Sequence, residues 1–125
     1  MNSEKGMTLI EVLITVLILT MLTSIAVLSV GFYINEGKTR IAEGDLATLK
    51  AASRIYILDK ETTPPSLVNL VNTYIPELPK DPFAAGTADY LLASDAGMLY
   101  IYSVGPNRVD DSHAGDDIVV TIAIL

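Results

Sequence analysis

The amino terminus reads Lys5-Gly6-Met7-Thr8-Leu9-Ile10-Glu11-Val12, and the chain then carries no charged residue from Val12 to Ile34. As an α-helix this uncharged run is about 34 Å long, against roughly 30 Å for the hydrocarbon core of a bilayer. It therefore predicts a helix that spans a membrane with some tilt. Glu11 lies at its start, and a lone carboxylate costs about 2.5–3.5 kcal/mol at mid-membrane and less near the surface. Such an acid is a candidate functional residue that needs a partner.

The remaining composition is that of a small soluble domain. The chain has 125 residues, 50% of them hydrophobic, and no cysteine, so a disulfide is excluded. Outside the apolar run about ninety residues remain, enough for one modest core that is often helped by a metal or by neighbours. The net charge is −7, and after Pro79 the only basic residues are Lys80 and Arg108. Nucleic-acid binding is therefore not expected, because it needs clustered Lys and Arg.

Two simpler interpretations of the apolar run compete with a functional one. A secretory signal peptide would have a core of about 7–15 apolar residues and a cleavage site of small residues, for which Ser24-Ile25-Ala26 could serve. The run before that site is too long, and it contains Glu11. A plain membrane anchor for an unrelated domain explains the length of the run, but it does not explain Gly6 at the polar–apolar junction. It explains Glu11 only if that side chain snorkels to the membrane surface.

The segment from Lys5 to Glu11 resembles the class III signal of type IV pilins and pseudopilins. In that family a prepilin peptidase cuts after the glycine on the cytoplasmic side and methylates the new amino terminus. The resemblance implies a leader of residues 1–6, cleavage between Gly6 and Met7, methylation at Met7, and a transmembrane and assembly helix over residues 7–34. Methionine at the first mature position departs from the phenylalanine that is usual there.

The same resemblance implies an assembly role for Glu11. In a filament of such subunits, the Glu11 carboxylate of one copy can reach the Met7 amine of its neighbour. The pair would cancel two charges that are each costly in a dry helix bundle, and it would penalise other axial alignments. We therefore expect Glu11 to act in assembly.

An amphipathic pattern follows the membrane segment, over residues 35–62. Apolar or small residues recur there at intervals of three and four. They are Ala42, Leu46, Leu49, Ser53 and Tyr56, with Ala52 and Ile55 beside them. One long helix is predicted to run to near Asp59, before the break that Thr63-Pro64-Pro65 imposes. The stripe predicts core packing and no ligand.

Residues 63–125 are predicted to form a globular head. Ser66 could cap a short helix that runs to about Tyr74. Strands are predicted at residues 90–92, 98–103 and 117–123. A turn is predicted at residues 94–97. An antiparallel sheet of these strands, laid on the amphipathic half of the long helix, makes the fold α+β. The type IV pilin fold, which the resemblance implies, has this arrangement of a long membrane-spanning helix against a small antiparallel sheet.

The last connection in the head is rich in acids. Its aspartates fall within eight residues and are Asp110, Asp111, Asp116 and Asp117. A calcium ion, which takes six to eight oxygen ligands, would remove their mutual repulsion. The spacing does not match an EF-hand, and a solvated acidic turn is the alternative. His113, in the same connection, is expected to point into solvent.

The head also carries motifs similar to those of major pseudopilins of type II secretion systems. The motifs are Leu78–Phe83, Tyr102–Asn107 and Gly115–Ile118. In that family an aspartate-rich loop binds calcium and orders the subunit for assembly. The resemblance implies a structural calcium ion whose candidate ligands are Asp110, Asp111, Ser112, Asp116 and Asp117. Phe83 replaces the tryptophan that often follows the Asp-Pro pair.

The resemblance covers nearly the whole chain and implies a structural subunit of a helical pseudopilus in type II secretion. The implied partners are further copies of the chain, prepilin peptidase, an inner-membrane assembly platform with its ATPase, and minor pseudopilins. The implied location is the inner membrane, single-pass, with a cytoplasmic amino terminus and a periplasmic head, and then a filament in the cell envelope. A type IV pilin in a surface filament and a membrane-tethered calcium-binding module are the alternatives. An enzyme is not expected, because the chain has one histidine and no cysteine, and its late aspartates share one loop.

Overall fold

The computed structural model describes residues 6–124, and 52 of them form one helix, α1 (Leu9–Lys60). The predicted single long helix is confirmed, with its end one residue beyond Asp59. The chain divides into two compact units, with the boundary between Asn35 and Glu36, so that α1 contributes to both. Residues 6–35 are all exposed, whereas the buried residues of the described chain all lie in the second unit.

The first unit is an apolar helix with internally satisfied hydroxyl groups. An 18-residue window of α1 reaches a mean hydropathy of 2.5, so this helix is long and apolar enough to cross a membrane. Thr15 Oγ1 donates to the carbonyl of Glu11 and Thr23 Oγ1 to that of Leu19, both at 2.7 Å. Because such bonds satisfy hydroxyls within the helix itself, the unit presents an almost wholly apolar surface.

In the second unit, one face of α1 packs into the core. The buried positions are Ala42, Leu46, Leu49, Ala52 and Ser53. Ile55 was predicted to lie beside this stripe, but its side chain is 53% exposed. Two residues beyond Ser53 a helix has turned by about 200°, which carries Ile55 away from the buried face. The helix ends at Lys60, because Glu61 adopts a left-handed φ of 54° and Thr63-Pro64-Pro65 follows.

The head contains an antiparallel sheet of three strands in the order β1-β2-β3. The strands are β1 (Leu91–Asp95), β2 (Met98–Ser103) and β3 (Ile118–Ala123). Asp95 pairs with Met98, so the β1–β2 turn consists of Ala96 and Gly97 alone, with φ of 47° and 79°. Two consecutive positive φ angles are typical of a type I′ hairpin turn. The predicted turn at 94–97 is therefore two residues shorter in the structure.

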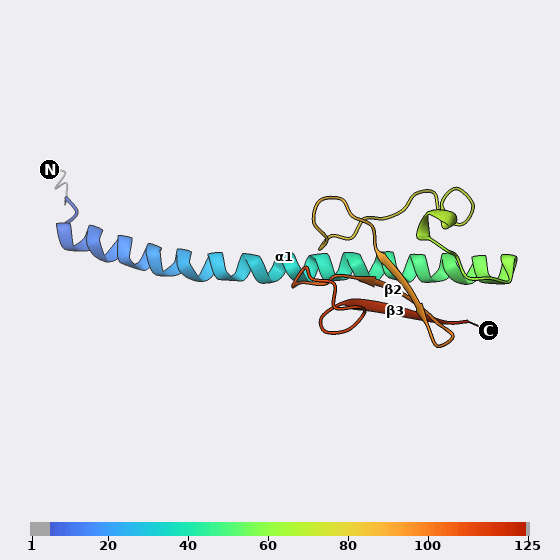
Figure 1. Ribbon diagram of the computed structural model, residues 1–125. Helices are drawn as coiled ribbons and strands as arrows, with labels where there is room; N and C mark the ends of the chain where they lie inside the picture. Colours follow the sequence, from blue (N-terminus) through green and yellow to red (C-terminus); the bar gives the residue numbers. More distant parts are fainter. Residues whose placement is uncertain (1–5, 125) are drawn as a thin grey trace. The chain divides into compact units, whose positions relative to one another are not determined.

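The sheet and the outer half of α1 share one apolar core, which confirms the predicted α+β arrangement (Figure 1). Leu46 and Leu49 of α1 belong to the same buried cluster as Leu99 and Ile101 of β2 and Ile122 of β3. The cluster is completed by residues from the connection between α1 and β1, namely Leu67, Leu70, Ile75, Phe83 and Tyr90. Layering a helix on one face of a sheet lets each bury its apolar side on the other.

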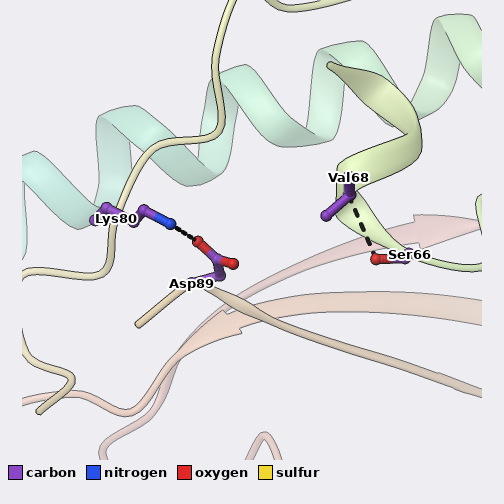
Figure 2. Close-up of polar contacts among 4 residues, drawn as sticks. All are labelled: Ser66, Val68, Lys80 and Asp89. Atoms are coloured by element: carbon purple, nitrogen blue, oxygen red, sulfur yellow. Dashed lines mark hydrogen bonds and ion pairs between the residues drawn. The ribbon is translucent and has the colours of Figure 1, made fainter. Parts of the chain in front are cut away.

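The short helix after α1 is smaller than predicted. It is a 3₁₀ helix, η1 (Leu67–Leu70), and Ser66 caps it by accepting a hydrogen bond from the Val68 amide (Figure 2). The prediction of a helix to Tyr74 is wrong, because Asn72 adopts a φ of 68° and turns the chain back. That turn lets Ile75 pair with Val71 and enter the core.

The proline-rich connection that follows is held at its ends. The Lys80 ammonium and the Asp89 carboxylate form an ion pair, which Figure 2 shows to the left of η1. The two residues also form an isolated antiparallel bridge, and the Asp81 amide donates to the Ala88 carbonyl at 3.1 Å. Residues 80–89 therefore form a closed loop that leads directly into β1.

Candidate functional site

The predicted processing junction lies ahead of the first helix. Gly6 and Met7 are exposed and precede Leu9, where α1 begins. An added side-chain carbon at Gly6 would meet nothing within 4 Å. The rest of the predicted leader, residues 1–5, lies outside the described residues. The junction is thus an exposed segment outside the helix.

Glu11 caps its own helix together with Thr8. The Thr8 amide donates to Glu11 Oε2 at 2.8 Å, and the Glu11 amide donates to Thr8 Oγ1 at 3.4 Å. This reciprocal pair is a capping box, whose sequence signature is Ser or Thr followed three residues later by Glu or Gln. The role of Thr8 was missed in the sequence, although Thr8-x-x-Glu11 carries that signature. In the single subunit, the carboxylate is therefore held at the start of α1 by its own backbone.

In the acidic loop, Asn107 donates hydrogen bonds to two of the aspartates. The Asn107 amide donates to Asp116 Oδ2 at 3.0 Å, and Asn107 Nδ2 donates to Asp111 Oδ2 at 2.9 Å. Asn107 Oδ1 accepts from the Val109 amide at 2.7 Å. Sequence reasoning missed this residue, whose signal is its place after Gly105-Pro106, where Asn commonly supports a turn.

The remaining predicted ligands lie in the same loop with different surroundings. Asp110 Oδ1 accepts from the Ser112 amide at 2.8 Å, and both residues are exposed. Asp117 Oδ2 accepts from the Asp111 amide at 3.1 Å, while its Oδ1 is buried without a hydrogen-bond partner. Burial raises the pKa of the Asp117 carboxyl, and the negative charges of Asp111 and Asp110 raise this pKa further. The backbone amides of His113 and Asp111 lower it.

Carboxylate oxygens are ligands that a hard cation prefers, but the described side chains of this loop are not arranged as a complete metal-binding site. Among residues 6–124, no three side chains of Asp, Glu or His converge as a metal-binding group. The buried, unpartnered Oδ1 of Asp117 and the nearby charges of Asp110 and Asp111 nevertheless supply the oxygen donors that calcium prefers. A carboxylate oxygen buried without a partner is costly, and an ion would satisfy it.

His113 does not point into solvent as predicted. Its ring stacks on Tyr100, with centroids 4.3 Å apart and planes inclined by 14°, and it meets Tyr102 edge-on at 5.8 Å. The loop folds back over strand β2, with Ser112 and His113 both at a φ of 57°, and this brings the imidazole onto the tyrosine rings. The histidine therefore fastens the loop to the sheet by aromatic packing.

The comparisons with known proteins agree with this architecture. Residues 1–30 match the family described as the prokaryotic N-terminal methylation motif. The long apolar helix and the small antiparallel sheet packed on its outer half give the chain a pilin-like α+β architecture. No solved structure matches the chain significantly.

The full-length relatives define the family more narrowly. The chain is 31% identical to the Type II secretion system core protein G of Klebsiella pneumoniae, with 94% of each chain covered. It is 29% identical to the proteins of the same name from Pseudomonas aeruginosa, covering 93% and 91%, and Dickeya chrysanthemi, covering 92% and 84%. The chain belongs to the family of Type II secretion system core protein G, the major pseudopilins. These relatives bear the name of a secretion-system component and not of an enzyme.

Proposed function

We propose that the mature chain starts at Met7 and polymerises, in many copies, into the helical pseudopilus of a type II secretion system. Family membership and the match to the methylation motif support this proposal. Prepilin peptidase would cut between Gly6 and Met7 and methylate the new amine. Both residues are exposed ahead of α1, so the cut needs no unwinding of the helix.

One observation carries the proposal: the surface of residues 9–34 is apolar and entirely exposed. Such a surface is stable only in lipid or against other apolar surfaces. Before assembly, this apolar surface would lie in the bilayer. After assembly, it would lie against the same segments of neighbouring copies. An inner-membrane platform and its ATPase would move the chain from the first environment to the second, with minor pseudopilins as further subunits.

Glu11 is proposed to pair with the Met7 amine of a neighbouring copy. Its carboxylate is already fixed at the first turn of α1, where it accepts from the Thr8 amide. A protonated amine is a stronger donor to a carboxylate than a neutral amide, so an incoming amine can compete for the same oxygen. Pairing would also remove an isolated charge from the apolar interior of the filament.

The proposed topology follows from the same processing step. The amino terminus would lie in the cytoplasm, where the peptidase acts, and the head, residues 63–125, in the periplasm. The single apolar helix is consistent with anchoring in the inner membrane before assembly.

We also propose that the acidic loop holds a structural calcium ion. Asp110, Asp111, Ser112, Asp116 and Asp117 are the residues from which its ligands would come. The unpartnered Oδ1 of Asp117 and the neighbouring Asp110 and Asp111 charges support this assignment. When bound, calcium would neutralise these charges and stiffen the loop.

Production of the chain with and without prepilin peptidase, in cells that carry the assembly platform, tests the central proposal. With the peptidase, the intact mass should show the loss of Met1–Gly6 and the gain of one methyl group, and microscopy should show filaments. Without the peptidase, the full-length chain should stay in the membrane. Filaments built from chains that retain residues 1–6 would overturn the proposal.

A further inference from the structure

The carboxylate of Asp81 is the most deeply buried charged group of the described chain, and sequence reasoning assigned it no role. The residue is 3% exposed. Its Oδ1 accepts from the Phe83 amide at 2.9 Å and from Ser103 Oγ at 2.7 Å, and its Oδ2 accepts from the Val104 amide at 3.0 Å. A buried carboxylate is tolerated when such donors replace its water.

These bonds join two connections that are distant in sequence. Asp81 belongs to the closed loop 80–89, whereas Ser103 ends strand β2 and is 22 residues further along. Ser103 Oγ also accepts from the Gly105 amide at 3.2 Å. The carboxylate therefore holds the chain at the point where it leaves β2 and enters the acidic loop.

Gly105, the residue after Val104, lies at the start of the acidic loop and against the backbone of Asp116 at its other end; we call this close approach the neck of the loop. A side-chain carbon built on Gly105 would lie 2.1 Å from the Asp116 carbonyl oxygen, so the two backbone segments are nearly in contact. Ser103 pairs with Ile118, directly after Asp117. Both ends of the acidic loop are thus attached to the residue that Asp81 holds.

We propose that Asp81 is a positioning residue for the acidic loop: it fixes Ser103 and Val104, and through them the neck at Gly105 and Asp116, so that the loop carboxylates are preorganised for a cation. The cation-binding part of this inference rests on the calcium ion proposed above. The loop-positioning part does not, and it can be measured without metal.

An Asp81→Asn variant tests the inference, because it keeps the shape of the side chain and removes one acceptor. The amide nitrogen must face either Val104 N–H or Phe83 N–H, so at least one buried donor loses its partner. A Ser103→Ala variant removes the bond from Ser103 Oγ to Asp81, together with the bond that Ser103 Oγ accepts from the Gly105 amide, and serves where Asp81→Asn fails to fold. Tyr90→Phe is the matched control, since it removes one hydrogen bond of the same head, to Asp45 on α1.

The measurements are made on the full chain in detergent micelles. Hydrogen exchange without calcium is followed by mass spectrometry, separately for residues 105–117 and for strands β1 and β2. In Asp81→Asn we expect exchange in residues 105–117 to rise about tenfold, since a bond to a charged group contributes that much or more. Exchange in strands β1 and β2 should rise less. In Tyr90→Phe, exchange in residues 105–117 should rise no more than exchange in the strands. Equal acceleration of loop and strands in Asp81→Asn would overturn the inference.

Calcium titration, monitored through the same loop peptides, supplies the second readout. Asp81→Asn should raise the calcium Kd about tenfold at unchanged stoichiometry, while Tyr90→Phe leaves it close to wild type. A Kd that is equal in all three proteins would show that Asp81 does not preorganise the site. If the wild-type chain binds no calcium at all, the proposed ion is wrong, and the exchange measurement alone decides the role of Asp81.

Discussion

Tyr90 Oη donates a hydrogen bond of 2.9 Å to Asp45 Oδ2, and so ties the residue before strand β1 to the outer half of helix α1. The two residues are 45 positions apart, and the Tyr90 ring is buried in the core. Burial, with a contribution from the bond to Asp45, raises the pKa of the Tyr90 hydroxyl far above its usual range. The phenol is therefore a hydrogen-bond donor throughout the physiological pH range and holds the helix to the head.

Removal of this hydroxyl should weaken the head. Every buried residue of the described chain lies after residue 35, so a truncated chain that begins at Glu36 is expected to keep the fold. In that chain, Tyr90→Phe should lower the free energy of unfolding by about 1 kcal/mol, measured by urea denaturation. Asp45→Ala should cost more, about 1–3 kcal/mol, because it leaves a buried hydroxyl without an acceptor. Equal stability of Tyr90→Phe and wild type would remove this bond from the contacts that stabilise the head.

Two glycines with nearly the same positive φ should respond differently to alanine. Gly105 and Gly86 have φ of 67° and 70°, but an added carbon meets the Asp116 backbone at Gly105 and nothing within 4 Å at Gly86. Gly86→Ala should therefore cost about 1–2 kcal/mol, the price of the left-handed conformation alone. Gly105→Ala adds a clash with backbone and should cost clearly more, or prevent folding. Similar melting temperatures for the two variants would contradict the tight neck at residue 105.

The Tyr74 hydroxyl should lose its proton at an unusually high pH, because it donates a hydrogen bond to Asp59. Tyr74 Oη donates to Asp59 Oδ2 at 2.6 Å, and this bond raises the pKa of Tyr74 from 10.0 to about 12. Since the pKa is higher in the folded state, the stabilisation is present below pH 10 and is lost as the pH rises through about 12. The difference in tyrosinate absorbance between wild type and Tyr74→Phe measures this pKa. In Asp59→Asn the pKa of Tyr74 should fall toward 10, and an unchanged value would rule out the proposed cause.

Calcium removal should destabilise the head if the acidic loop binds the ion. At a calcium concentration of about 100 times Kd, binding contributes roughly 2.7 kcal/mol, and chelation removes it. For a domain of this size the melting temperature should fall by about ten degrees or more. Asp117→Asn should abolish the effect of chelation, whereas Asp95→Asn, at the distant β1–β2 hairpin, should not. A wild-type melting temperature that is insensitive to chelator would make the loop a solvated acidic turn.

Two substitutions of Glu11 separate its capping role from its charge. Gln keeps the acceptor that a capping box needs, whereas Ala removes both acceptor and charge. If the carboxylate pairs with the amine of the next copy, Glu11→Gln and Glu11→Ala should both insert into the membrane and both lose filaments. Filament counts by microscopy, with membrane levels measured by immunoblot, provide the check. Normal filaments from Glu11→Gln would mean that the residue acts as a helix cap only.

Local patterns in the sequence were sufficient for the long helix, the three strands and the class of protein, but not for the extent of the short helix after α1. The uncharged run after Glu11 indicated the long helix, and the spacing of Ala42, Leu46 and Leu49 indicated the face that it buries. Such patterns work because each residue's preference depends on neighbours a few positions away. The same holds for the segment Lys5–Glu11, whose match to the methylation motif needs no fold at all.

Contacts between distant residues were decided only by the tertiary structure. Ser103 at the end of β2 donates to Asp81 of the loop 80–89, the acidic loop folds His113 onto Tyr100, and its neck brings Gly105 to Asp116. None of these pairs has a local signal, because each depends on how separate connections of the head pack against strand β2 or against one another. The sequence by itself thus determined which segments are helical, extended or apolar, whereas the folded chain decided which polar groups are buried together, since burial depends on the packing of the whole head.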